Sequence, residues 1–198
     1  MNPDVTEAKR RLRRAMEEQR ARTPMEELIQ ASAQLCQRMR QEPVWQSAGA
    51  VMLFYPVKGE PDIRPLLAEA LSDGRRVVLP RFVKERDAYE GAEVLSLEAL
   101  RPGHFGILEP PPECATFALN RLDLTLVPGV AFDCEGCRLG RGKGYYDRLL
   151  RVVGGLSCGV AFDWQLVPAV PVHPHDVRLN LILTPSRWLR CSGARGGL

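Results

Sequence analysis

The segment GRGKGYYDR, residues 140–148, contains residue types that can bind phosphate and a metal ion. Its three glycines alternate with Arg141 and Lys143, and Asp147 falls one turn into an expected helix. Glycines let backbone N–H groups approach an anion, and the helix start adds the positive end of its dipole. The two cations add full charge, and Asp147 is a suitable Mg²⁺ ligand beside phosphate oxygens. The segment therefore favours phosphate binding over a mobile surface hairpin.

The same segment departs from both common phosphate-binding patterns. In G-x-x-x-x-G-K-[ST], the first glycine position holds Cys137 and the hydroxyl position holds Gly144. The dinucleotide pattern G-x-G-x-x-G also fails, because Gly140, Gly142 and Gly144 alternate. A phosphate-binding loop of a third kind is what these residues indicate.

Three further groups of residues are candidates for chemistry. Glu60 is a loop acid after a buried strand, where it either orients a substrate or is a solvated turn residue. The segment HPHD, 173–176, either binds a transition metal or forms a turn whose Asp176 faces the same cleft. Cys134 and Cys137 form a single C-x-x-C, which is half of a structural zinc site and lies before a glycine loop rather than at a helix start. We expect neither zinc nor redox chemistry from that pair.

Composition narrows the class of protein. The formal charge of +3, from 27 Lys+Arg and 24 Asp+Glu, is too small to argue for nucleic acid, but clustered arginines suit an anionic small molecule. The basic segment 9–14 either binds nucleic acid or is a solvated face paired with glutamates, and without aromatic interleaving we expect no nucleic-acid partner. Six cysteines show no secreted disulfide pattern, and no apolar run suggests a signal peptide or membrane span. We expect a cytoplasmic enzyme.

The elements that must position these residues follow from periodicity and punctuation. Asn2-Pro3-Asp4 is expected to begin a first helix, and Thr23 to Glu26 form a capping box for a second helix ending near Gln41. The apolar run 49–56 predicts a strand buried on both faces, and RRVVLPRF predicts another that ends at Pro80. Between them, Asp62 is expected to cap a helix that Gly74 closes.

The second half continues the alternation. Residues 92–97 resemble a strand, the proline-rich stretch 102–115 is expected to be irregular, and 122–132 predicts a buried strand with its exit. A helix over 145–153 and strands at 156–162 and 180–185 follow. Residues 1–198 thus predict a single-domain α/β protein with a mostly parallel, Rossmann-like open sheet and helices on both faces. The charged, glycine-rich segments follow strand ends, where such sheets bind ligands.

With these motifs in place, the chain resembles the 5-formyltetrahydrofolate cyclo-ligase family, also called 5,10-methenyltetrahydrofolate synthetase. The resemblance extends almost end to end and is most specific in R-L-G-x-G-x-G-Y-Y-D-R. The matching segments are KRRLR (9–13), FYPVKGEPD (54–62), FGILEP (105–110), VPGVAFDCEGCRLGRGKGYYDR (127–148) and VPVHPHDVRLNLILT (170–184).

The resemblance implies an ATP- and Mg²⁺-dependent conversion of 5-formyltetrahydrofolate to 5,10-methenyltetrahydrofolate through a phosphorylated formyl group. It implies catalytic roles for Lys143, Arg141 and Glu60, folate contacts for Tyr55, Glu60 and Tyr146, and Mg²⁺ ligation by Asp147 and Asp176. For ATP it implies Lys9, Arg10, Arg11, Leu12, Arg13, Arg138, Leu139, Gly140, Arg141, Gly142, Lys143, Gly144, Tyr145 and Tyr146. The expected partners are ATP and the folate alone, with the protein a monomer.

Two positions depart from the family pattern. His173 stands where the family often has Glu, and Asn180 stands where it often has Asp, which puts Mg²⁺ affinity in question. A relative of the family with another substrate is the second enzyme hypothesis, and Glu60, Tyr55 and Tyr146 argue against it. A basic module that binds RNA or DNA is the hypothesis from a different class.

Overall fold

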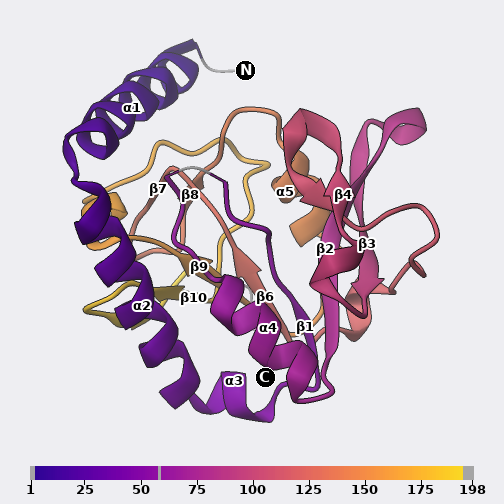
Figure 1. Ribbon diagram of the computed structural model, residues 1–198. Helices are drawn as coiled ribbons and strands as arrows, with labels where there is room; N and C mark the ends of the chain where they lie inside the picture. The colour runs from indigo at the N-terminus through magenta and orange to yellow at the C-terminus, as the bar shows by residue number, and fades with distance from the viewer. Residues whose placement is uncertain (1–2, 58, 194–198) are drawn as a thin grey trace.

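The computed structural model describes residues 3–57 and 59–193, which alternate between helices and strands (Figure 1). The predicted cap at Asn2 lies outside the described residues. The α-helices are α1 Pro3–Arg22, α2 Met25–Gln41, α3 Pro43–Ser47, α4 Arg64–Ser72 and α5 Tyr145–Leu150. The strands are β1 Ala50–Met52, β2 Arg76–Val83, β3 Ala88–Val94, β4 Arg101–Pro102, β5 Leu108–Glu109, β6 Leu124–Val127, β7 Ala131–Phe132, β8 Arg138–Leu139, β9 Leu156–Val160, β10 Leu181–Leu183 and β11 Trp188–Arg190. Short 3-10 helices are η1 Lys84–Arg86, η2 Leu97–Ala99, η3 His104–Gly106, η4 Leu119–Arg121 and η5 Asp163–Gln165.

Seven strands form one sheet in the order β11-β10-β9-β6-β1-β2-β3. The five inner strands pair in parallel, and the two outer strands, β3 and β11, pair antiparallel to their neighbours. Helix α4 connects the parallel strands β1 and β2, as the alternating pattern predicts. The predicted mostly parallel α/β architecture is confirmed.

Helices cover both faces of this sheet, and the strand side chains show which helix covers which face. Successive side chains of a strand point to opposite faces. Val51 packs with α2, α3 and α4 in the larger core cluster, whereas Ala50 and Met52 pack with Leu149 of α5. The same alternation in β10 sends Leu181 and Leu183 to the first face and Ile182 to the second.

The predicted capping box at the start of α2 is wrong. Pro24 occupies the N-cap and provides no side-chain cap. The Thr23 hydroxyl instead donates a hydrogen bond to the Gln19 carbonyl, 2.9 Å away, at the end of α1. The predicted cap of α4 is also displaced, since Ile63 is the N-cap residue, although Asp62 accepts a hydrogen bond from the Arg64 N–H at 3.0 Å. Gly74 ends that helix with a φ of 71°, in agreement with the prediction.

Strand β2 does not end at Pro80, and the reason lies in its partners. On one side β1 is paired only as far as Met52 opposite Val78, while on the other side β3 pairs as far as Ala88 opposite Val83. Beyond Val78, the backbone N–H and C=O groups of β2 form strand hydrogen bonds only with β3. Pro80 has no N–H to donate toward the side that β1 no longer occupies, so it leaves the hydrogen bonds between β2 and β3 intact.

The remaining boundaries differ by a few residues from the pattern. Strand β3 begins at Ala88, earlier than the predicted 92–97, because the antiparallel pairing with β2 extends across it. The exit of β6 contains a small hairpin of β7 and β8, and the glycine loop follows β8. Strand β11 was not predicted. No helix within the described residues combines the length and apolar character needed to cross a bilayer.

Candidate functional site

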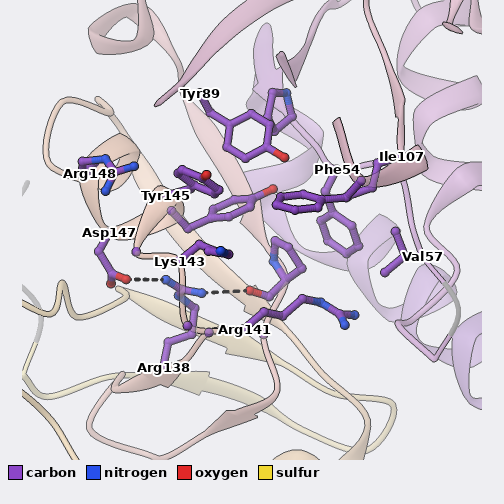
Figure 2. A pocket seen from close by; sticks show the side chains of 18 of the residues that line it. Phe54, Val57, Tyr89, Ile107, Arg138, Arg141, Lys143, Tyr145, Asp147 and Arg148 are labelled. Atoms are coloured by element: carbon purple, nitrogen blue, oxygen red, sulfur yellow. Dashed lines mark hydrogen bonds and ion pairs between the residues drawn. The ribbon is translucent and has the colours of Figure 1, made fainter. Parts of the chain in front are cut away.

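A cavity of about 490 Å³ opens beyond the carboxyl ends of β1 and β6 (Figure 2). Its walls come from α1, the chain after β1, the chain after β6, the glycine loop with the start of α5, and the turn at His173. This volume falls in the range of small-molecule sites. The prediction that the charged and glycine-rich segments gather at the strand ends agrees with this geometry.

Helix α1 contributes two cations to the cavity. The Lys9 ammonium lies 2.5 Å from a carboxylate oxygen of Asp176, with both side chains nearly buried. The Arg13 guanidinium donates to the Gly140 carbonyl at 2.9 Å, and burial lowers the pKa of Arg13 although Asp176 raises it. Arg10 and Arg11 point elsewhere, since both are largely exposed and pair with Glu7. Four-residue spacing puts Lys9 and Arg13 on one face of the helix.

The remaining members of the predicted ATP set divide by burial. Both leucines of the predicted set belong to the core: Leu139 is part of a small cluster with Ala131, and Leu12 packs against that cluster. Neither leucine lines the cavity. Arg141 and Lys143 are exposed and line the cavity with the three glycines. Gly142 and Gly144 have φ values of 105° and 68°, a region that only glycine adopts without strain.

Arg138 lies beneath this loop and connects its two ends. Its guanidinium is 3.2 Å from the Asp147 carboxylate, 5.6 Å from the centre of the Tyr146 ring and 3.4 Å from the Pro128 carbonyl (Figure 2). Its side chain is only 3% exposed, and its Nε is buried without a partner among the described residues. Arg138 thus fixes where α5 begins relative to the exit of β6.

Glu60 meets the glycine loop across the cavity. Its carboxylate is 2.9 Å from the Arg141 guanidinium and also accepts a hydrogen bond from the Val57 N–H at 3.1 Å. The side chain is 9% exposed, so the interpretation of Glu60 as a solvated turn residue is wrong. Tyr55 and Tyr146 line the same cavity, and burial raises the pKa of the Tyr146 hydroxyl.

An apolar and aromatic wall faces the charged loop, and the sequence patterns did not predict it. Figure 2 shows Phe54, Tyr89 and Ile107 on the side of the cavity away from Arg138 and Asp147. Tyr145 stacks edge-on against Tyr89, with ring centres 5.3 Å apart. Phe105 is 60% exposed and has a φ of 60°, a strained conformation for a bulky residue. The segment FGILEP, 105–110, which matches the family pattern, was the signal available in the sequence for Phe105 and Ile107.

Glu109 is buried in this wall. Its Oε2 accepts a hydrogen bond from the Phe82 N–H at 3.0 Å, while its Oε1 has no hydrogen-bond partner among the described residues. Burial raises the pKa of Glu109, and burial together with the Glu109 charge raises the pKa of Tyr89 to about 12. The wall therefore holds one acid that is almost completely buried.

The donor set for a metal ion is small. Asp147 and Asp176 both line the cavity, with side chains 18% and 12% exposed. Among the described residues, no three His, Cys, Asp or Glu side chains gather into a metal site. Mg²⁺ is commonly held by one or two carboxylates plus substrate phosphates, so these residues fit Mg²⁺ only together with a bound nucleotide.

The acid and histidine at the turn 173–176 affect each other. Burial alone would raise the pKa of Asp176, but hydrogen bonds from Lys9 and from the His173 N–H lower it. Burial and the nearby Lys9 charge lower the pKa of His173, whose ring stacks on His175 with centres 5.2 Å apart. The Asp176 N–H bonds to the His173 carbonyl at 3.0 Å, so HPHD is the turn with a cleft-facing acid.

The other departure from the family pattern, Asn180, lies outside the cavity wall, as do Cys134 and Cys137. Asn180 accepts hydrogen bonds from the N–H and hydroxyl of Ser157, both at 2.9 Å, and so joins β9 to the start of β10. Cys134 and Cys137 are free thiols, the first exposed and the second in the core, and burial raises the pKa of Cys137 to about 11. Asp133 organises their turn by accepting from the Glu135 and Cys137 N–H groups, each at 3.0 Å.

The chain is similar to known proteins over most of its length. Residues 5–185 match the model of the 5-formyltetrahydrofolate cyclo-ligase family. A 5-formyltetrahydrofolate cyclo-ligase of Mycolicibacterium smegmatis is 37% identical over 72% of this chain and 77% of its own. The Escherichia coli K12 enzyme of the same name is 34% identical over 85% of this chain and 94% of its own. The solved structure of Aquifex aeolicus 5,10-methenyltetrahydrofolate synthetase superposes with a TM-score of 0.84 at 34% identity, covering 96% of each chain.

An open α/β sheet with a cationic loop and an aromatic wall at its strand ends is typical of enzymes that bind small anionic molecules at this edge. The chain belongs to the 5-formyltetrahydrofolate cyclo-ligase family. The resemblance inferred from its motifs is thereby confirmed.

Proposed function

We propose that this enzyme converts 5-formyltetrahydrofolate and ATP to 5,10-methenyltetrahydrofolate, ADP and phosphate, with Mg²⁺ bound alongside ATP. The observation that carries the proposal is the Glu60–Arg141 contact of 2.9 Å. This contact joins the glycine loop, which would bind phosphate, to the acid that follows β1, and both residues line the same cavity. A phosphoryl transfer between two bound molecules needs this juxtaposition.

The proposed reaction has two bond-exchanging steps. The oxygen of the N5-formyl group attacks the γ-phosphorus of ATP, and the bond from that phosphorus to the ADP oxygen breaks, so ADP leaves with the electron pair. N10 of the resulting imino-phosphate then attacks the former formyl carbon and loses its proton. The bond from that carbon to the phosphate oxygen breaks, which releases phosphate and leaves the methenyl bridge.

The cations supply most of the proposed catalysis. Lys143 and Arg141 stabilise the charge that develops on the transferred phosphoryl group, since positioning and charge stabilisation dominate such reactions. Lys9 and Arg13 hold the triphosphate from α1, and backbone N–H groups of the glycine loop approach it. Arg138, buried below the loop, positions Tyr146 and Asp147 rather than contacting phosphate.

The acids and aromatic residues orient the folate in this proposal. Glu60 and Tyr55 contact it from the chain after β1, and Tyr146 contacts it from α5. Asp147 and Asp176 would hold Mg²⁺ together with phosphate oxygens. The bound ion would neutralise phosphate charge and so favour attack by the formyl oxygen.

We also propose that residues 1–198 act as one domain, as a monomer, in the cytoplasm. The basic face of α1 does not support a nucleic-acid function, because Arg10 and Arg11 pair with Glu7 while Lys9 and Arg13 face the cavity.

An absorbance assay tests the reaction directly. The enzyme is incubated with 5-formyltetrahydrofolate, Mg²⁺ and ATP, and the methenyl product is followed with ATP omitted as the control. We expect product and inorganic phosphate in equal amounts. A protein that binds ATP yet forms no methenyl product would rule out this activity and would redirect the search to other acceptors.

A further inference from the structure

The end of α5 carries a basic side chain at the cavity that has no role in the proposed reaction. Arg151 directly follows Leu150 and is the C-cap residue of the helix. Its guanidinium donates a hydrogen bond to the His175 carbonyl at 3.1 Å. Asp147 lies four residues earlier, on the same face of α5, and both residues line the cavity. Arg151 therefore connects the helix that carries Asp147 to the turn that carries Asp176.

The charge of Arg151 is not neutralised by an acid. In the part of the chain that the structure describes, Arg151 forms no ion pair, and its hydrogen bond to the His175 carbonyl is the only one it makes. The side chain is exposed at the cavity, so its remaining N–H groups are available to an anion. Most of the other basic side chains at the cavity pair with acids: Lys9 with Asp176, Arg138 with Asp147, Arg141 with Glu60 and Arg148 with Asp87.

The proposed reaction brings phosphate to the neighbourhood of Arg151. Asp147 and Asp176 fit Mg²⁺ only together with phosphate oxygens, so the phosphate chain of ATP has to reach both α5 and the turn 173–176. Arg151 connects these same two segments. A guanidinium donates paired hydrogen bonds to phosphate oxygens, whereas an ammonium acts as a single point charge. The chemistry of Arg151 and its place at the cavity therefore both suit a phosphate ligand.

The two ends of α5 face different parts of the substrates. Tyr145, at the start, packs edge-on against Tyr89 of the aromatic wall, which would hold the folate. Arg151 follows six residues later, which corresponds to about 9 Å along a helix. Figure 2 shows Asp147 on the side of the cavity away from Phe54. The phosphate that meets the formyl group thus belongs near the start of α5, and the phosphates that remain on ADP belong toward its end.

We propose that Arg151 is a further ATP-binding residue, which donates hydrogen bonds to the phosphates that remain on ADP after the transfer. In this position its charge stabilises the negative charge that develops on the departing ADP. The hydrogen bond to the His175 carbonyl holds the guanidinium at this end of the cavity and leaves its other N–H groups for the ligand. This inference rests on the proposed function, since it assigns a residue to the leaving group of the same reaction.

Calorimetric binding of ATP and of ADP to Arg151→Gln tests the contact without folate and without turnover. We expect the Kd of both nucleotides to rise about tenfold, because charge-assisted hydrogen bonds to phosphate are lost. The rise should persist in EDTA, since the guanidinium contacts phosphate directly. Arg151→Lys, which retains the charge, should recover part of the affinity. The melting temperature of both variants should stay within about 2 °C of wild type, because the side chain is exposed.

Arg148→Gln is the matched control, since Arg148 belongs to the same helix and lines the same cavity but is already paired with Asp87. It should change both Kd values by no more than about twofold. Wild-type Kd values in Arg151→Gln would overturn the inference, and so would a loss for ATP alone. A loss confined to samples with Mg²⁺ would also overturn it, by showing that Arg151 only positions Asp147 and Asp176. Wild-type protein that binds neither nucleotide would instead refute the proposed function itself.

Discussion

Individual side chains of the site divide into those exposed at the cavity and those buried against other side chains. Lys143 is exposed at the cavity, whereas Arg138 is 3% exposed and contacts Asp147 and Tyr146 from below. Exposed side chains contribute little to the folded state, while a buried charge that loses its partner destabilises it strongly. Function and stability should therefore respond differently at these neighbouring positions.

Replacing Lys143 with alanine tests the exposed class. We expect kcat/KM for ATP to fall about 10- to 1000-fold, the range seen when one transition-state donor is removed. The melting temperature should change by no more than about 1 °C, because the substitution takes nothing from the core. Steady-state kinetics and thermal unfolding of the same sample provide both numbers. A melting temperature that drops with the activity would show that Lys143 acts on the fold instead.

Asp147→Asn tests metal binding by α5. The amide oxygen can still accept from Arg138, but a neutral ligand binds Mg²⁺ less tightly, so the Mg²⁺ concentration for half-maximal rate should rise at least about tenfold. Asp87→Asn is the control, since Asp87 is exposed near the same helix and does not line the cavity. Identical Mg²⁺ titrations for Asp147→Asn and wild type would remove Asp147 from the metal site.

Elements position these residues through few contacts, and α1 is the plainest example. Near its start α1 is attached by Lys9 to Asp176, then by Arg13 to the Gly140 carbonyl. Leu12 and Met16 add apolar contacts with the small cluster around Ala131. One wall of the cavity therefore depends on a helix with a limited buried face.

Acid should loosen this helix. The pKa of Asp176 is lower in the folded protein than its unfolded value of about 3.9, so the stabilisation is present above that pH and disappears as pH falls through the folded value. At pH 7 we expect the pair to contribute about 1–3 kcal/mol to holding α1. Hydrogen exchange of α1 amides, compared at each pH with Asp176→Asn, measures it. A difference from the variant that persisted unchanged at pH 2 would contradict this assignment.

The short helix η3 is a second positioning element, and Gly103 allows it to lie close to the Glu109 side chain. A Cβ at Gly103 would lie 2.6 Å from the Glu109 carboxyl group, so Gly103→Ala must displace η3 or the buried acid. We expect Gly103→Ala to lower the unfolding free energy by about 1–3 kcal/mol. The substitution should raise the KM for the folate more than the KM for ATP. Gly49→Ala is the control, because its Cβ would meet only Asp123 at an ordinary 3.6 Å. Equal effects of the two substitutions would dismiss the role of η3.

At the scale of the whole molecule, both edges of the sheet are protected from further pairing. The outer side of β3 is covered by residues 115–117, through bonds from the Glu93 N–H to the Ala115 carbonyl and from the Phe117 N–H to the Gly91 carbonyl. At the other edge, β11 spans only Trp188–Arg190. Short or covered edges oppose strand-to-strand association. Light scattering should give the mass of a single chain across a wide concentration range, and a mass that doubles with concentration would refute the monomer.

How much could be predicted from the sequence depended on how local each feature is. The glycine loop combines its glycines, cations and acid within nine residues, so its chemistry can be inferred from the pattern and agrees with its place at the cavity. Tyr89 and Ile107 reach the same cavity from separate segments, and only the tertiary fold brings them to the loop. The burial of Arg138 could not be predicted either. An arginine beside a glycine-rich loop looks the same in the sequence whether its guanidinium faces the cavity or packs beneath the loop.

The Lys9–Asp176 contact has a consequence for how the enzyme is made. The two residues are 167 positions apart, so α1 leaves the ribosome long before its partner exists. Until residues 173–176 have been synthesised, Lys9 lacks the Asp176 carboxylate that attaches α1 to the rest of the cavity. Helix α1 can form early because its backbone hydrogen bonds are local, but the cavity wall that it provides can assemble only after residues 131–176 have been synthesised. A chain that stops before His173 therefore carries the cationic loop in its sequence without a complete cavity wall at α1.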